Sequence, residues 1–304
     1  MKIHSFNEWD PLREIIVGEA SRANWPTKDP VWIKSAETTL YKDSPLPHGP
    51  VPQWIIDEAN EDLQGLCDIL TLAGVTVNRP SWLDFQSLDG MYNYCPRDRL
   101  LVAGNTIVDP AMMIPCRDME WKSLAKVIAG NSVKYMPRNE GMVLDAANIL
   151  RLNNNWLYLE SESGNREAYN WLVEQFPDIN IEMCNFYAGV HIDSTILALR
   201  EGLAVVNASR VMPEYLPKAI QDWDIIYAYN VVAQDFYQYP IASKWIGLNM
   251  LSIDPNTVIV DKNQTELIRD IERKGLTVVP HELRHSRTLG GGFHCVTLDT
   301  WREA

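Results

Sequence analysis

The sequence predicts an α/β fold built from five repeats of one strand–helix–strand unit. Short strands rich in β-branched residues alternate with helices whose apolar residues recur at three- and four-residue spacing. The predicted helices end near residues 74, 130, 177, 222 and 275, so the unit recurs at a nearly constant period. With 46% hydrophobic and 22% charged residues among 304, the chain has the composition of a folded protein, and we expect one domain over residues 1–304.

The same local signals place the elements of each unit. Gly74, Gly130 and Gly275 follow the first, second and fifth helices, where a helix end favours a left-handed residue, and Pro177 ends the third. The expected elements, unit by unit, are strand 14–18, helix 53–73 and strand 75–77; strands 100–102 and 107–108, helix 119–129 and strand 133–136; strand 156–159, helix 166–176 and strand 179–181; strand 203–206, helix 213–221 and strand 225–227; strand 258–260, helix 264–274 and strand 276–279.

One segment of the first unit departs from this pattern. The stretch 26–52 contains six prolines, and we expect an ordered surface loop there, inserted in the first unit.

Five such strand–helix–strand units could also form one ordinary doubly wound sheet. Neither GxGxxG nor GxxxxGK[ST] follows the first strand, so nothing in the sequence supports nucleotide binding.

Charge and hydropathy narrow the class of partner. The chain has 27 Lys and Arg against 40 Asp and Glu, a formal charge of −13, which would repel the phosphates of a nucleic acid. No apolar run approaches the roughly 18 residues that span a bilayer, and residues 1–10 lack the apolar core of a signal peptide. We therefore expect a cytoplasmic protein whose partners are small molecules or other proteins.

The five cysteines predict neither a disulfide framework nor a metal site. Their number is odd and their spacing contains no CxxC pair, so reduced thiols are expected. A second metal signal is the HExxH pattern of residues 281–285, in which both histidines must lie on one helical face. Pro280 precedes it and Gly290 follows closely, which leaves little room for such a helix, so we expect no zinc there.

One polar segment recurs in each unit at the same phase. Asp98, Asp145, Asp193, Ser243 and Cys295 are separated by 47, 48, 50 and 52 residues. Each has an ordinary alternative, such as a solvated turn or a helix cap. Their common phase predicts that five loops converge on one centre.

Cys295 is the cysteine with catalytic surroundings, since three glycines, an aromatic residue and His294 precede it. A thiolate nucleophile needs a general acid or base and a group that orients it, which His191 with Asp145 or Asp193 could supply. Carboxylates around a thiol raise its pKa unless a cationic substrate neutralises them. This favours a guanidinium or amidine substrate, which two carboxylates can hold by bidentate hydrogen bonds.

These residues resemble those of amidinotransferases of the glycine amidinotransferase and inosamine-phosphate amidinotransferase type, in the guanidine-modifying pentein superfamily. The matching segments run in the family's order from residue 7 to the C-terminal end, and the last is the most specific. They are residues 7–18, Pro96-Arg97-Asp98, Leu144-Asp145-Ala146-Ala147-Asn148, His191-Ile192-Asp193-Ser194-Thr195, Ser243-Lys244-Trp245 and Leu289-Gly290-Gly291-Gly292-Phe293-His294-Cys295.

The resemblance implies a five-fold pseudosymmetric α/β-propeller of ββαβ-type units. It also implies roles: Cys295 as nucleophile, His191 as general acid and base, Asp145 as its partner, and a substrate site in which Asp98 and Asp193 hold the guanidinium and Arg210 and Ser243 the amino-acid end. The implied reaction transfers the amidino group of L-arginine through an amidino-cysteine to an acceptor amine, releases ornithine and uses no metal or organic cofactor.

Other functions remain open at this point. The segment 112–117 lacks the family's usual Trp-Arg pair, Ala242 replaces a second serine of glycine amidinotransferases, and residues 186–190 differ from their loop, which leaves the acceptor amine undetermined. The main alternative is a hydrolase of the same superfamily, an arginine deiminase or dihydrolase, in which water resolves the intermediate. A non-catalytic guanidine-binding protein is a further alternative, and a homodimer is the default assembly.

Overall fold

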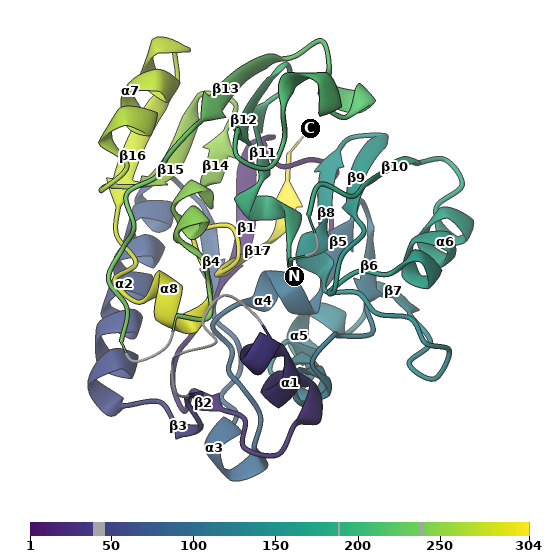
Figure 1. Ribbon diagram of the computed structural model, residues 1–304, viewed down its shortest axis with the longest axis vertical. Coiled ribbons are helices and arrows are strands. Elements are labelled where there is room, and N and C mark those ends of the chain that lie inside the picture. The colour runs from purple at the N-terminus through teal and green to yellow at the C-terminus, as the bar shows by residue number, and fades with distance from the viewer. Residues whose placement is uncertain (39–45, 188, 238–239, 304) are drawn as a thin grey trace.

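The computed structural model, shown in Figure 1, describes residues 1–38, 46–187, 189–237 and 240–303. Over these residues the strands form five three-stranded sheets and one two-stranded sheet, β2–β3 (Asn24–Trp25 and Gly49–Pro50). In strand order the five are β17 (Thr297–Arg302), β1 (Leu12–Val17) and β4 (Thr76–Asn78); β5 (Leu101–Ala103), β6 (Thr106–Asp109) and β7 (Ser132–Tyr135); β8 (Ile149–Leu152), β9 (Asn155–Leu159) and β10 (Asn180–Cys184); β11 (Ile196–Arg200), β12 (Leu203–Asn207) and β13 (Asp224–Ala228); β14 (Leu251–Asp254), β15 (Thr257–Asp261) and β16 (Thr277–His281).

All five sheets have the same pairing. The middle strand pairs antiparallel with one neighbour and parallel with the other, and a helical segment connects the parallel pair. In the first sheet the antiparallel partner is the C-terminal strand β17, so the two ends of the chain share one sheet. The predicted five-unit repeat is confirmed at the level of strand pairing, and the single doubly wound sheet is excluded for the described residues.

The helical segments vary much more than the sheets do. The α-helices are α1 (Pro30–Thr38), α2 (Gln53–Leu72), α3 (Phe85–Leu88), α4 (Pro96–Arg99), α5 (Ala125–Ile128), α6 (Arg166–Gln175), α7 (Thr265–Arg273) and α8 (Ser286–Leu289). The 3₁₀ turns are η1 (Pro115–Lys122), η2 (Ala146–Asn148), η3 (Ile192–Ser194), η4 (Pro213–Tyr215), η5 (Lys218–Ile220) and η6 (Lys244–Leu248). Within the described residues, no helix combines the length and the apolar character that a bilayer crossing requires.

Helix α2 shows how the sequence signals act. Its apolar residues at three- and four-residue spacing, among them Ile55, Leu63, Leu66 and Leu70, are buried in the largest core cluster, between α2 and strands β1, β14 and β15. The helix ends as predicted, because Gly74 has φ +81° and Val75 N–H donates to the Leu70 carbonyl at 3.0 Å.

Three predicted segments are wrong in form. The expected helix 213–221 is two separate turns, η4 and η5, because Pro217 has no N–H and its ring blocks a continuous helix. The expected helix 119–129 is the 3₁₀ turn η1 followed by α5, and here the Ser123 carbonyl accepts from Ser81 N–H at 2.8 Å instead of from the next turn. The proline-rich stretch is more than a loop, since it contains α1 and β3, while residues 39–45 lie outside the described residues.

The outer antiparallel strands of the five sheets contact one another in turn. Strand β17 contacts β5, β8 contacts β11, and β11 contacts β14. Arg151 of β8 donates to the Val102 carbonyl of β5 at 2.8 Å, and Arg302 of β17 donates to the Ser252 carbonyl of β14 at 3.0 Å. Residues that precede these strands along the chain are therefore brought to neighbouring positions.

Candidate active site

Four of the five predicted polar segments lie in short turns that lead into an outer strand. Asp98 is in α4 before β5, Asp145 directly precedes η2 and β8, Asp193 is in η3 before β11, and Ser243 directly precedes η6 and β14. Helix α4 contacts η2, η2 contacts η3, and η3 contacts η6. The fifth, Cys295, lies two residues before β17, which α4 also contacts.

Cys295 faces a carboxylate. It is buried, 1% exposed, and its thiol donates to Asp193 Oδ2 at 3.3 Å. Asn249 fixes the backbone here, since its Oδ1 accepts from the N–H groups of His294 (2.8 Å) and Cys295 (3.1 Å), while its Nδ2 donates to the Asp193 carbonyl (3.0 Å). The glycines leave no spare room, because a Cβ on Gly292 would come within 2.5 Å of the Asn249 side chain.

His191 lies between two other carboxylates. Its Nε2 is 3.1 Å from Asp145 Oδ2, and its Nδ1 is 3.7 Å from Asp98 Oδ1. Asp145 is itself held, since its Oδ1 accepts from Met113 N–H at 2.9 Å. His191 has φ +58°, an uncommon conformation for a residue with a side chain, and the Tyr187 hydroxyl donates to its carbonyl. The surrounding structure therefore fixes the imidazole against both carboxylates.

The carboxylates of the site raise the pKa of both Cys295 and His191. Burial, together with the charges of Asp193 and Asp98, raises the pKa of the Cys295 thiol well above its ordinary range. Burial alone would lower the pKa of His191, but the carboxylates of Asp98, Asp145 and Asp193 outweigh it and raise that pKa to about 9. Without a bound cation, the site therefore holds a neutral thiol and a protonated imidazole.

One carboxylate oxygen of Asp98 has no hydrogen-bond partner among the described residues. Burial raises its pKa, although His191 and Arg117 act against this. Arg117 donates to Asp98 Oδ2 at 2.8 Å, whereas the buried Oδ1 accepts no hydrogen bond from the described residues. Arg117 is in turn held by both oxygens of Glu120, at 2.9 and 3.0 Å. An N–H donor arriving next to His191 would satisfy this oxygen.

Arg210 and Ser243 are placed differently from the other five. Arg210 donates to the hydroxyls of Ser194 (3.0 Å) and Thr195 (2.8 Å), directly after Asp193, and lies 4.2 Å from the centre of the Tyr187 ring. Burial lowers the pKa of its guanidinium. Ser243 is half-buried and directly precedes η6, which contacts η3, and among the described residues no hydrogen bond joins its side chain to the other predicted site residues.

Known proteins resemble this chain over nearly its whole length. The chain is 38% identical over 335 residues to inosamine-phosphate amidinotransferase 1 of Streptomyces griseus, covering 98% of this chain and 96% of the relative. It is 27% identical to the mitochondrial glycine amidinotransferase of Xenopus tropicalis, covering 98% and 82%. No family model matches the chain. The chain belongs to the amidinotransferase family.

Solved structures support the same assignment. An inosamine-phosphate amidinotransferase of Streptomyces griseus superposes with a TM-score of 0.92 at 37% identity, covering 99% of this chain and 97% of that one. An amidinotransferase of the saxitoxin biosynthetic pathway from Microseira wollei gives 0.86 at 27%, covering 99% and 98%. A dimethylarginine dimethylaminohydrolase from Pseudomonas aeruginosa, 14% identical with a TM-score of 0.67, shares the fold. The chain is thus an α/β protein of the amidinotransferase family and a transferase of amidino groups.

The HExxH residues lie outside this site and outside a common helix. His281 ends strand β16 and its Nε2 contacts the Asp62 carbonyl at 2.8 Å, whereas His285 precedes α8 and contacts Glu58 at 2.8 Å. Within the part of the chain that the structure describes, no three His, Cys, Asp or Glu side chains are grouped as metal ligands would be.

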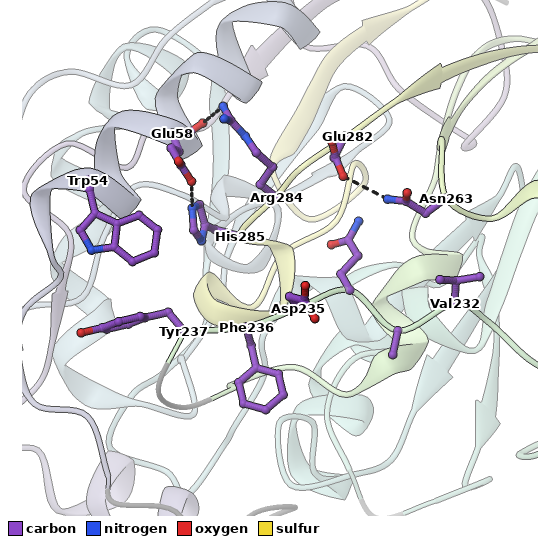
Figure 2. A pocket seen from close by; sticks show the side chains of 12 residues that line it. Trp54, Glu58, Val232, Asp235, Phe236, Tyr237, Asn263, Glu282, Arg284 and His285 are labelled. Atoms are coloured by element: carbon purple, nitrogen blue, oxygen red, sulfur yellow. Dashed lines mark hydrogen bonds and ion pairs between the residues drawn. The ribbon is translucent and has the colours of Figure 1, made fainter.

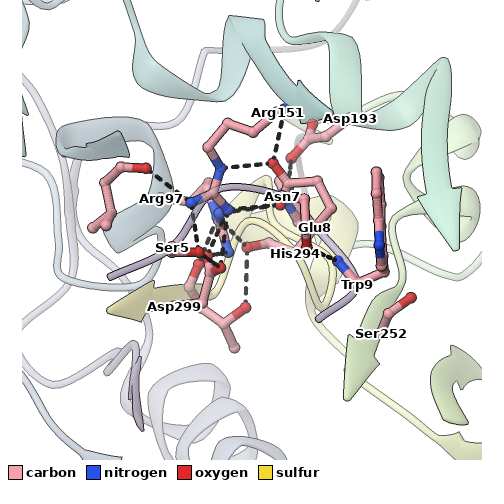
Figure 3. A network of polar contacts seen from close by, with 12 residues as sticks. Ser5, Asn7, Glu8, Trp9, Arg97, Arg151, Asp193, Ser252, His294 and Asp299 are labelled. Carbon is pink, nitrogen blue, oxygen red and sulfur yellow. Dashed lines mark hydrogen bonds and ion pairs between the residues drawn. The ribbon is translucent and has the colours of Figure 1, made fainter. Parts of the chain in front are cut away.

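Several residues at the site were not predicted from the sequence. Asn249 and Glu120 lie outside the matching segments, and the sequence indicated no role of their own for Glu8 and His294, which lie within them. Glu8 lies in a buried ion network with Arg151 and Asp299 (Figure 3). The available signal was a polar residue among apolar ones, as in Gly-Leu-Asn-Met-Leu at 247–251, which indicates a buried polar side chain with a structural partner.

A pocket lies away from the predicted site residues. A pocket of about 450 Å³ is bounded by α2, the segment 232–237 and the residues before α8 (Figure 2). It presents Trp54 and Tyr237 on one side and Asn263 and Glu282 on the other, and none of the predicted site residues lines it. Cys295 lies outside this pocket, next to the carboxylate of Asp193.

Proposed function

We propose that this amidinotransferase moves the amidino group of L-arginine through a covalent intermediate on Cys295 to an acceptor amine, releasing ornithine. The observation that carries the proposal is the arrangement of the Cys295 thiol and the His191 imidazole among three buried carboxylates. Asp193 faces Cys295, and Asp98 and Asp145 face His191. A guanidinium supplies further positive charge and a planar set of N–H donors for these carboxylates.

Donor binding and activation of the thiol are one event in this proposal. The guanidinium lies between Asp98 and Asp193 and donates to the buried Asp98 Oδ1. Its charge offsets the carboxylates that raise the pKa of Cys295, so that pKa falls when the donor binds. The thiol then loses its proton to solvent, and the thiolate forms next to its target carbon. The site therefore exposes a reactive sulfur only to a cationic substrate.

His191 then acts as general acid and later as general base. The thiolate attacks the central guanidinium carbon, and the resulting tetrahedral intermediate breaks its bond to the ornithine nitrogen, which takes a proton from His191. A pKa of about 9 keeps His191 protonated for this step, and Asp145 at 3.1 Å orients the ring. The acceptor amine next gives a proton to His191 and attacks the amidino carbon, which returns the cysteine and yields a new guanidino compound.

Arg210 and Ser243 are proposed to hold the amino-acid end of arginine. The partners of Arg210 within the described residues are neutral hydroxyl and carbonyl groups and an aromatic ring, so a substrate carboxylate would be its first anionic partner there. Ser243 directly precedes the neighbouring turn η6.

We also infer that the five sheets are the blades of an α/β-propeller, and that residues 1–304 form one catalytic domain. The identical strand pairing in all five sheets and the successive contacts between their outer strands support this arrangement. It explains why residues separated by about 50 positions meet, since each precedes the same strand of its own blade.

The test is incubation with guanidino-labelled L-arginine, with and without a panel of amines, followed by mass spectrometry. We expect ornithine, an amidino adduct on Cys295, and a guanidino product only with a suitable amine. Cys295→Ala should lose all three, while Cys184→Ala, which alters a buried cysteine of β10, should retain them. Absence of both ornithine and adduct would refute the proposal, and citrulline or ammonia release without amine would assign the chain to the hydrolases.

The same panel addresses the acceptor. The names of the relatives specify an inosamine phosphate and glycine, so both belong in the panel with lysine and other amines. The proposal for the donor and the intermediate does not depend on which of them is accepted.

A further inference from the structure

His294, the residue before the proposed nucleophile, is buried between two carboxylates. It is 4% exposed, its Nδ1 is 2.8 Å from Asp193 Oδ2, and its Nε2 is 3.2 Å from Glu8 Oε2. Glu8 comes from the N-terminal segment and Asp193 from η3, so the imidazole bridges parts of the chain far apart in sequence (Figure 3). The proposed mechanism assigns this residue no role.

Both carboxylates are engaged as ionised groups. Glu8 accepts from Arg151 through both oxygens, from Nε at 2.9 Å and Nη2 at 2.8 Å. Asp193 Oδ2 accepts from the Cys295 thiol as well as facing His294. An ionised carboxylate can only accept hydrogen bonds, and a neutral imidazole has one donor and one acceptor nitrogen. A neutral His294 would therefore turn a lone pair toward one of the two anions.

The wider surroundings favour the same state. The charged groups that act on His294 are Glu8, Asp193 and Arg97, and Arg151 and Asp299 belong to the same network. Burial and Arg97 disfavour a charged imidazole, whereas the two contacting carboxylates favour it, and the pKa of His294 is raised as a result. The adjoining cavity, lined in part by Glu8, Asp193, Ser252 and His294, is only about 10 Å³, the size of about one water molecule.

We propose that His294 is a positioning residue, a permanent imidazolium clamped between Glu8 and Asp193, which keeps Asp193 ionised and oriented toward Cys295 and the donor guanidinium. This rests on the proposed function, in which Asp193 holds the donor. His294 donates through both ring nitrogens and touches neither the substrate nor the reacting sulfur.

This clamp has a consequence for the thiol. Hydrogen bonds from His294 lower the pKa of Asp193 even though burial acts in the opposite direction. An Asp193 held in this way is too weak a base to take the thiol proton, so Cys295 stays a neutral thiol until a cation enters the site. The clamp thereby protects a buried, substrate-free cysteine from becoming a reactive thiolate.

The direct test is nitrogen NMR of the unmodified protein labelled at its histidine rings. We expect His294 to show protons on both ring nitrogens at about pH 8, well above the ordinary histidine pKa of about 6.5. His294→Gln assigns the signal by its loss. A singly protonated ring at that pH would overturn the proposal, and this readout needs neither arginine nor turnover, so it is independent of whether the proposed function fails.

A kinetic test separates positioning from a purely structural role. In His294→Gln, Asp193 loses a charged donor, so its pKa rises, and the acid side of the kcat/KM profile for arginine should become steeper and move to higher pH, because protonation of Asp193 then adds to that of Asp98. His285→Gln removes another buried histidine–carboxylate contact, with Glu58, and should leave the profile unchanged. A reduced rate with an unshifted profile in His294→Gln would contradict the inference, and if that variant does not fold, the NMR result decides.

Discussion

Replacing Asp145 by Asn should lower the pKa of His191 and shift the alkaline limit of activity. Asn keeps the size and the hydrogen-bonding oxygen of the side chain but removes the negative charge 3.1 Å from His191 Nε2. His191 would then retain Asp98, at 3.7 Å from Nδ1, as its nearest carboxylate. The variant therefore isolates the electrostatic contribution of one of the two nearest anions.

The structure sets the size of the effect. The pKa of His191 rises from an ordinary value of 6.5 to about 9, which corresponds to about 3 kcal/mol of preference for the charged ring, after burial has opposed it. An opposite charge within hydrogen-bonding distance accounts for about one to three pH units. We therefore expect the pKa of His191 in Asp145→Asn to fall by about one to two pH units, into the range of about 7 to 8.

Two assays measure this change. The alkaline limb of the kcat/KM profile reports the proposed general acid, and it should move down by the same one to two pH units, as estimated above. Stability should follow by linkage: because folding raises the pKa of His191, its contribution is complete below the unfolded value of 6.5 and is lost as the pH rises through about 9. In the variant this contribution is smaller and is lost at lower pH, as urea unfolding at several pH values would show.

The control is Glu160→Gln, which removes a partly exposed carboxylate whose charged partner is Arg166, and it should change neither profile. If Asp145→Asn lost activity with its alkaline limb at the parent position, the reasoning would be wrong, because the carboxylate would then not be setting the proton affinity of His191.

Three further predictions test the packing and the substrate site. Gly291→Ala would bring a Cβ within 2.5 Å of the Cys95 sulfur, so it should cost about 1–3 kcal/mol of stability and reduce kcat by moving the cysteine loop; equal stability by urea unfolding would contradict this. Arg151→Met removes one of several cations from two buried carboxylates, Glu8 and Asp299, and should cost about 3 kcal/mol, measured in the same way, and a loss below 1 kcal/mol would show that the network does not hold the fold. Arg210→Met should raise KM for arginine by about tenfold or more with little effect on agmatine, which lacks the carboxylate, and an equal effect on both donors would remove Arg210 from the carboxylate site.

The sequence contained enough information for the repeat and for most of the strands and helices. Apolar spacing located α2, α6 and α7 within one or two residues, and the left-handed glycines 74, 130 and 275 are where the helix ends required them. The predicted fourth helix does not form, because Pro217 interrupts it. Short outer strands such as β11 and β14 were not predicted, because a strand of four or five residues is too short to give a clear periodic signal.

The constant interval between Asp98, Asp145, Asp193, Ser243 and Cys295 determined, without any coordinates, that one polar residue per unit occupies an equivalent place. The sequence could not determine which of these residues touch, because contacts between units depend on how the sheets pack against one another. Tertiary structure decided that His191 pairs with Asp145, that Cys295 faces Asp193, and that Asn249 and His294 hold the two in register. Residues with such roles leave no periodic trace, because a buried polar side chain is selected by the position of its partner in space and not by its neighbours in the chain.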